Sequence, residues 1–182
     1  MEEVTVSGTG DFVVPALSDI PSAGMSKIYE GNFDSISLCV GPFTVRVEEG
    51  SKYAIKLDNT GSGIVASGPI ECTVLTQCAR CLEDARIAIN EEVEGFFIRE
   101  NETRPEDMAE DEVEFLSVQG EADLFTCIAS TLVYAFPQDP LCKDDCKGLC
   151  PKCGANLNEE SCECANEPDP LSPFAALKDL NL

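Results

Sequence analysis

The sequence predicts an α+β protein: an antiparallel β meander or partly open barrel, one packed helix, and a Cys-rich, zinc-ribbon-like C-terminal segment. Three observations support this fold class. Runs with apolar residues at alternate positions follow one another between residues 36 and 93, as in half-buried strands. A stripe of apolar residues at helical spacing covers residues 123–136. Six cysteines then fall between Cys142 and Cys164.

The strands are predicted in chain order from their alternating residues. The alternation covers residues 36–40, 43–47, 53–57, 64–66, 70–76 and 87–93, with a turn at 59–63. The C-x-x-C segment Cys78–Cys81 falls between the last two runs, so we expect it at the connection between two long strands. Before residue 35, Val4 and Val6 alternate, but glycines and prolines then interrupt the apolar residues, and no element is predicted there.

The chain divides into three parts. Residues 1–137 form a β-rich domain that ends in an acidic loop at 99–123 and a helix at 123–136, with Asp123 as its N-cap and Pro137 as its stop. The acidic loop is expected to be exposed; a docking site for a basic partner is the alternative. Residues 138–165 form a Cys-rich zinc-binding segment. Residues 166–182 form a tail in which Ser172 and Pro173 begin a short helix.

The composition indicates a globular protein with a large excess of negative charge. The 182 residues include 34 acidic and 12 basic side chains and no histidine, for a formal net charge of −22. No apolar run approaches the length of a membrane span, and the first residues lack the features of a secretory signal. We therefore expect a cytoplasmic protein. Because thiols stay reduced there, its eleven cysteines indicate metal rather than disulfides.

Eight of the cysteines are candidate metal ligands. Four thiolates at about 2.3 Å satisfy the tetrahedral preference of zinc, and a C-x-x-C turn brings two sulfurs close enough to share one ion. The Cys150–Cys153 turn is the stronger of the two, because Pro151 fixes φ on entry and Gly154 permits a turn with positive φ. The candidate ligands of one or two zinc ions are Cys78, Cys81, Cys142, Cys146, Cys150, Cys153, Cys162 and Cys164.

Two arrangements of these ligands are open. The preferred one is a local site, formed by Cys150, Cys153, Cys162 and Cys164, and a second site that clips the tail onto the sheet, formed by Cys78, Cys81, Cys142 and Cys146. The alternative is one site, formed by Cys146, Cys150, Cys153 and either Cys162 or Cys164. Buried thiols without metal and an iron–sulfur cluster are further interpretations. Each zinc site changes the charge by −2, so two bring it to about −26.

The remaining residues favour a scaffold over an active site. Cys39, Cys72 and Cys127 fall on strand or helix positions and are expected to be small core residues. Without histidine the commonest general base is missing, and no nucleophile triad, phosphate-binding loop or dinucleotide motif is present. Sets made only of cysteine are usually closed structural sites. We therefore predict that the protein is not an enzyme.

Several segments of the chain resemble the YceD family, a bacterial and plastid family named for large-ribosomal-RNA-subunit accumulation. They are QCARCLE (77–83), ADLF and LVYAFP (within 122–137), CKGLCPKCGANLNE and CEC (within 146–164), and FAALKDL with the preceding DP (within 169–180). The resemblance spans about residues 70–182. It implies a role in the synthesis, processing or stability of large-subunit ribosomal RNA, with no established enzymatic activity. It also implies that the eight candidate cysteines are motif positions of the family.

Charge and resemblance together favour a non-enzymatic accessory factor in large ribosomal subunit assembly. Its acidic surface would attract a basic ribosomal protein or assembly factor, because the same charge repels phosphate backbones. One alternative is a direct RNA-binding zinc module that uses Lys143, Lys147 and Lys152, although acidic residues surround these lysines and no stacking aromatics lie among them. Another is a zinc- or redox-responsive regulator. The charge has a simpler interpretation too, as an aid to solubility.

Overall fold

The computed structural model describes residues 12–33, 36–106 and 108–166. Its elements in chain order are β1 (Val13–Val14), α1 (Ala16–Asp19), β2 (Ser26–Phe33), β3 (Ser37–Val40), β4 (Phe43–Val47), β5 (Ser51–Asn59), β6 (Ile64–Gln77), β7 (Asp84–Ile98), η1 (Glu110–Glu112), β8 (Val113–Phe115), β9 (Ala122–Asp123), α2 (Leu124–Ala135) and η2 (Glu163–Asn166). The expected helix at 174–180 and the alternation of Val4 and Val6 lie outside the described residues.

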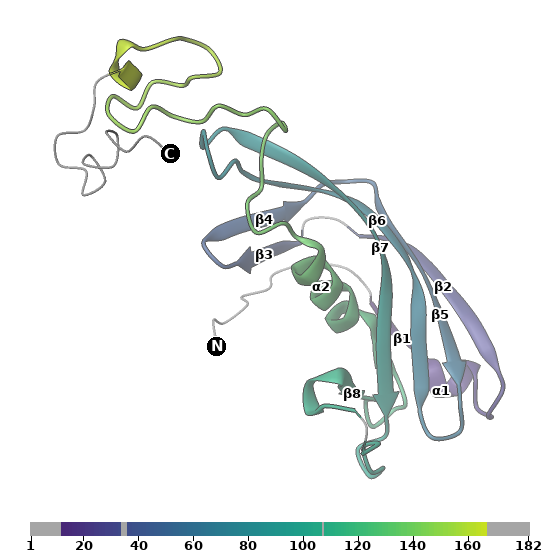
Figure 1. Ribbon diagram of the computed structural model, residues 1–182. Helices are drawn as coiled ribbons and strands as arrows, with labels where there is room; N and C mark the ends of the chain where they lie inside the picture. The colour runs from purple at the N-terminus through teal and green to yellow at the C-terminus, as the bar shows by residue number, and fades with distance from the viewer. Residues whose placement is uncertain (1–11, 34–35, 107, 167–182) are drawn as a thin grey trace, which may run out of the picture.

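An open, curved sheet forms the body of the protein, and α2 lies against one of its faces (Figure 1). β6 is the central strand. It pairs along its whole length with β7, while β5 and then β4 share its other edge. Apart from the parallel pair β7–β8, the pairing in this sheet is antiparallel. The predicted fold class, an α+β protein with an antiparallel, partly open sheet and one packed helix, is confirmed.

The topology departs from a simple meander at β4. This strand pairs with the end of β6, where Arg46 opposes Leu75, rather than with β5, which follows it in the chain. The two runs expected at 64–66 and 70–76 are also one strand, which continues through Gly68 and Pro69. Proline has no N–H to donate, and the ladder to β5 has no pair at these two residues. The pairing with β7 continues past them and holds the strand together.

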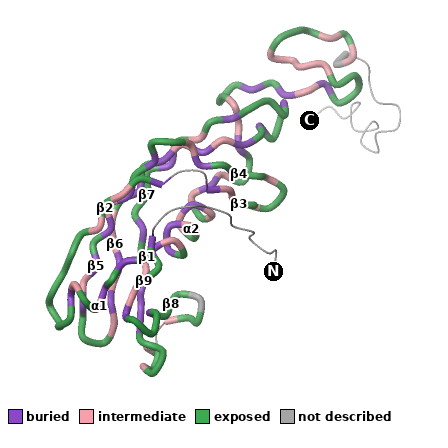
Figure 2. The backbone as a smooth tube through the Cα atoms, turned by 180° about the vertical axis from the view of Figure 1, so that it is seen from behind, coloured by how far each residue is buried: buried purple, intermediate pink, exposed green. Residues whose placement is uncertain are grey.

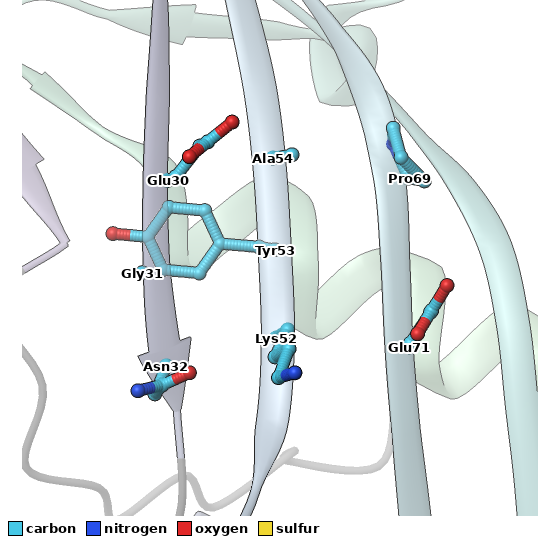
Figure 3. Close-up of a pocket in the computed structure, with 8 residues that line it drawn as sticks. All are labelled: Glu30, Gly31, Asn32, Lys52, Tyr53, Ala54, Pro69 and Glu71. Atoms are coloured by element: carbon cyan, nitrogen blue, oxygen red, sulfur yellow. The ribbon is translucent and has the colours of Figure 1, made fainter.

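The outer strand β2 was not predicted, because it lacks a clear alternation of apolar residues. The reason lies in its neighbour β5. Gly31 occupies a position of β2 that faces the core, and the ring of Tyr53 fills the space that a side chain would take (Figure 3). A Cβ on Gly31 would lie 2.6 Å from Tyr53 Oη. A residue that must be glycine breaks the apolar alternation, so the strand is hidden from pattern analysis. On the opposite face, Glu30 and Glu71 line an open hollow of about 420 Å³.

The core lies between the sheet and α2. The helix begins where expected, because the Asp123 carboxylate accepts a hydrogen bond from Phe125 N–H at 3.0 Å. Cys72 and Cys127 are buried in this core, as predicted, and burial raises their pKa to about 11 and about 12. The prediction for Cys39 is wrong. Cys39 is exposed, because it lies between Leu38 and Val40 and points to the other face of β3.

The segment at 99–123 contains more structure than the expected acidic loop. β8 adds to the end of β7 in parallel, and β9 pairs with β1. These strands are only three and two residues long, too short to show an alternation. They form because Val113, Leu116 and Ala122 are buried among the acidic residues. Within the described part of the chain, no helix is long and apolar enough to cross a membrane.

The Cys-rich tail extends beyond the hairpin end of β6 and β7, where β6 ends and β7 begins, away from the helix-covered core (Figure 1). Residues 151–164 are all half-buried or exposed, whereas most of the buried residues lie on the strands and α2 (Figure 2). This part of the tail therefore has little apolar burial to hold its shape, and other contacts must order it.

Candidate metal centre

The loop between β6 and β7 presents the first two sulfurs. The strand pairing ends at Gln77 and Asp84, and the six residues between them close a tight turn. Cys78 N–H donates to the Glu83 carbonyl at 2.8 Å, and Leu82 N–H donates to the Cys78 carbonyl at 3.0 Å. Leu82 adopts a positive φ of 62°, which is unusual without glycine. This turn fixes Cys78 and Cys81 at the end of two long strands, as the sequence predicted.

The tail supplies the other two sulfurs by lying across this loop. Ala79 N–H donates to the Pro140 carbonyl at 2.8 Å, and Leu149 N–H donates to the Arg80 carbonyl at 3.0 Å. The Arg80 guanidinium donates to the Cys146 carbonyl at 2.9 Å. Gly148 permits this approach, because its φ is +76° and a Cβ there would lie 3.0 Å from the Arg80 carbonyl oxygen.

Four sulfurs converge where the loop and the tail meet. We call Cys78, Cys81, Cys142 and Cys146 the sheet set; their Sγ atoms all lie within 4.8 Å of one another. The Cys78–Cys146 and Cys81–Cys142 sulfur distances are 3.7 and 3.5 Å. Sulfurs at about 2.3 Å from a tetrahedral zinc ion are about 3.8 Å apart, so the set fits such an ion. The site is enclosed by Leu141 and Leu149, which favours a closed structural centre.

Electrostatics in the sheet set also suits a cation. Burial works against ionisation of Cys78, but the backbone N–H groups of Cys81, Arg80 and Cys142 lower its pKa to about 6. Burial and the neighbouring Cys81 thiol raise the pKa of Cys142 to about 12. The four thiols therefore cannot all ionise side by side on their own. A bound dication would stabilise all four thiolates.

A second group of sulfurs lies within the tail itself. We call Cys150, Cys153, Cys162 and Cys164 the ribbon set; their Sγ atoms also lie within 4.8 Å of one another. The knuckle turns as predicted: Gly154 has a φ of +74°, and its N–H donates to the Cys150 carbonyl at 2.9 Å. The N–H groups of Cys153 and Lys152 lower the pKa of Cys150 to about 6. The Cys150 sulfur and burial raise the pKa of Cys162 to about 11.

The structure groups the eight cysteines into the two sets of the preferred arrangement. In the single-site alternative Cys146 would join Cys150 and Cys153, but its sulfur lies in the sheet set. Both sets could hold a metal ion. That they bind zinc stays a prediction.

Two residues that support the sheet set were not singled out in the sequence. Arg80 contacts the tail through both its guanidinium and its carbonyl. Asn158, eight residues beyond Cys150, donates from Nδ2 to Cys146 Sγ at 3.4 Å. This hydrogen bond lowers the pKa of Cys146. No local signal marks either residue, since the role of Arg80 depends on the tail lying across the loop and that of Asn158 on the tail folding back on itself.

Fold and sites together define a small α+β protein whose open antiparallel sheet carries a tail with two four-cysteine sets. The chain belongs to the YceD family. The family model described as "Large ribosomal RNA subunit accumulation protein YceD" matches residues 66–181, a range that includes all eight candidate ligands. The resemblance drawn from the motifs is thereby confirmed.

Two mycobacterial relatives share about a quarter of their aligned residues with this chain. An uncharacterized protein of Mycobacterium tuberculosis is 27% identical over 123 residues, which are 66% of this chain and 59% of that protein. One of Mycobacterium leprae is 25% identical over 126 residues, 69% of this chain and 57% of that protein. The chain thus spans less than two thirds of the length of these curated relatives.

A plant relative carries a descriptive name. "Large ribosomal RNA subunit accumulation protein YCED homolog 1, chloroplastic" of Arabidopsis thaliana is 36% identical over 58 residues, 32% of this chain and 18% of that protein. No solved structure gives a significant match.

Proposed function

We propose that this protein is a non-enzymatic, cytoplasmic accessory factor in large ribosomal subunit assembly and ribosomal RNA accumulation, and that it acts through its acidic surface on a basic protein partner. Membership of a family named for large ribosomal RNA accumulation supports the process. The net charge of −22 is the single observation that carries the mode of action, since such a field attracts basic proteins and repels bare RNA.

The excess charge is available for a partner because the chain cannot neutralise it internally. Even if every one of the 12 basic side chains paired with an acidic one, 22 of the 34 carboxylates would remain without a basic side chain. Five exposed carboxylates lie on β7 and on η1, the turn that leads into its neighbour β8. We call them the acidic strip; it consists of the exposed residues Glu91, Glu92 and Glu94 on β7, and Glu110 and Glu112 on η1.

A hollow beside the acidic strip suits a basic side chain. Glu94 and Glu112 line it together with Phe96, Met108 and Val65, and its volume is about 630 Å³. The Glu112 carboxylate is held in place by the Ala109 N–H at 2.6 Å. A lysine or arginine could lay its apolar stem along the phenylalanine and place its charge between the two carboxylates. We propose that a basic segment of the partner binds here.

Affinity purification of the tagged full chain at low and high salt tests this function. We expect large-subunit proteins or assembly factors to be enriched at low salt and to be lost at high salt, because screening weakens attraction between exposed charges. If no large-subunit component is enriched at low salt, the proposed function is wrong.

A pair of matched variants tests the location. Glu94→Gln with Glu112→Gln removes two carboxylates from the proposed site, whereas Glu30→Gln with Glu71→Gln removes two from the hollow on the sheet face. We expect the first variant to bind the partner about 2- to 30-fold more weakly, since two exposed ion pairs at about 0.2–1 kcal/mol each are lost. Equal losses in both variants would show that total charge, and not this site, determines binding.

We further propose that the sheet set and the ribbon set each hold one zinc ion with a structural role. Four sulfur ligands leave no open position for a substrate or water, which favours a scaffold rather than a catalytic centre. The sheet set would fasten the tail to the sheet, and the ribbon set would order residues 150–164, where no residue is buried beyond Cys150.

A further inference from the structure

Asn158 follows the first two cysteines of the ribbon set in the chain, and its side chain contacts the segment that carries Cys146 of the sheet set. Its Nδ2 group donates to Cys146 Sγ of the sheet set at 3.4 Å. Its Oδ1 atom accepts from Lys147 N–H at 2.9 Å, which fixes the amide so that one Nδ2 hydrogen faces the sulfur. The second Nδ2 hydrogen is used as well, by Asn156 Oδ1 at 2.9 Å. The side chain is therefore fully engaged and held in one orientation.

The ribbon places Asn158 in this position. The residue belongs to the loop between Cys153 and Cys162, both members of the ribbon set. Leu157 N–H donates to the Gly148 carbonyl at 2.9 Å, and Asn156 forms a bridge with Leu149, so this loop lies back along the segment that carries Cys146. Residues 154–161 are half-buried or exposed, so apolar burial contributes little to holding the loop.

We propose that Asn158 couples the two metal sites, so that an ion in the ribbon set raises the metal affinity of the sheet set. The inference rests on the zinc sites proposed above. An ion bound by the ribbon set would hold the loop between Cys153 and Cys162 in place. This loop positions the Asn158 Nδ2 donor beside the Cys146 sulfur. That bond stabilises a thiolate in a centre with four of them. Hydrogen bonds of this kind to metal ligands change metal affinity by about 10- to 100-fold.

Removal of zinc from the full chain by a competing chelator, with bound ions counted by native mass spectrometry, tests this coupling. In the Asn158→Leu variant we expect one of the two ions to leave at about 10- to 100-fold lower chelator concentration. Cys162→Ser with Cys164→Ser removes two ligands of the ribbon set. We expect the affinity of the sheet set for its remaining ion to fall by a similar factor. Adding Asn158→Leu to this double variant should lower the affinity of the sheet set no further, because each change removes the same coupling between the two sites.

Two further variants separate coupling from general damage to the fold. Asn158→Asp keeps an acceptor for Lys147 N–H but places a carboxylate beside the thiolates, so we expect a larger loss of affinity than with leucine. Glu159→Gln alters the adjacent exposed residue and should leave both affinities unchanged. Unchanged affinities in Asn158→Leu, or a full additional loss when it is combined with the disabled ribbon set, would overturn the proposal. So would a wild-type chain that holds fewer than two ions. Because only metal is measured, a failure to find a ribosomal partner would not affect the result.

Discussion

Replacing Cys142 and Cys146 with serine removes the two sulfurs that the tail contributes to the sheet set. The loop sulfurs of Cys78 and Cys81 stay in place, and the ribbon set is untouched. The main core is also untouched, because the sheet set and its apolar neighbours form a separate cluster at the end of β6 and β7. The change therefore tests one link, between the sheet and the tail.

The size of the effect follows from the loop that this link closes. Cys81 and Cys142 are 61 residues apart in the chain, and the stretch between them includes β7 and α2. A cross-link that closes a loop of this length lowers the entropy of the unfolded chain and stabilises the fold by about 4 kcal/mol. This is a large share of the roughly 5–15 kcal/mol that a domain has in total.

Urea unfolding of the zinc-loaded protein, with and without a chelator, measures this contribution. We expect the Cys142→Ser, Cys146→Ser variant and the chelated wild type to lose up to about 4 kcal/mol of unfolding free energy. We also expect the amides of Ala79 and Leu149 to lose protection from hydrogen exchange, since they donate across the link.

The matched control is Cys39→Ser, which removes an exposed thiol that belongs to neither set. It should leave the unfolding free energy within about 0.5 kcal/mol of wild type. If the double serine variant unfolds at the same urea concentration as this control, the tail does not stabilise the sheet and the reasoning fails.

Three further outcomes are expected. Asp123→Ala should lower the unfolding free energy by about 1 kcal/mol and Asp123→Asn by much less, because asparagine can still accept from Phe125 N–H; equal losses in urea unfolding would argue against capping. Hydrogen bonds from Lys27 and Tyr29 lower the pKa of the Asp19 carboxyl, so its contribution to stability is present above about pH 4, the unfolded value, and is lost as pH falls through the lower folded value. Asp19→Asn should therefore flatten the acid side of the stability profile, and an unchanged profile would refute the assignment. The protein should not shift ribosomal RNA in gels at about physiological salt, and tight binding would favour the RNA-binding alternative.

Much of the sheet could be predicted because its inner strands alternate. In β5, Tyr53, Ile55 and Leu57 face the core while polar residues face outward, and α2 shows a buried stripe behind its Asp123 cap. Elements without a local pattern were missed. β2 depends on the fit of Gly31 to a ring on β5, and β8 and β9 are too short to show a period.

In the candidate site too, some features could be predicted from the sequence and others could not. The two C-x-x-C turns indicated that Cys78 lies beside Cys81 and Cys150 beside Cys153, since such turns impose their own geometry. The grouping of the other four cysteines stayed open between two arrangements, and the structure favours the preferred one. The contacts of Arg80 could not be predicted, because they form only when the tail returns to a loop more than sixty residues earlier in the chain. The contact of Asn158 with Cys146 spans only 12 residues, but it forms only when the tail folds back on itself. Such contacts depend on tertiary structure and leave no trace in local sequence.

Native mass spectrometry of the purified full chain, combined with elemental analysis, tests most directly whether the two cysteine sets are metal centres. We expect two zinc ions per chain, one of them lost in the Cys142→Ser, Cys146→Ser variant. A chain that carries no metal, a single ion, or iron in place of zinc would contradict the two-site arrangement.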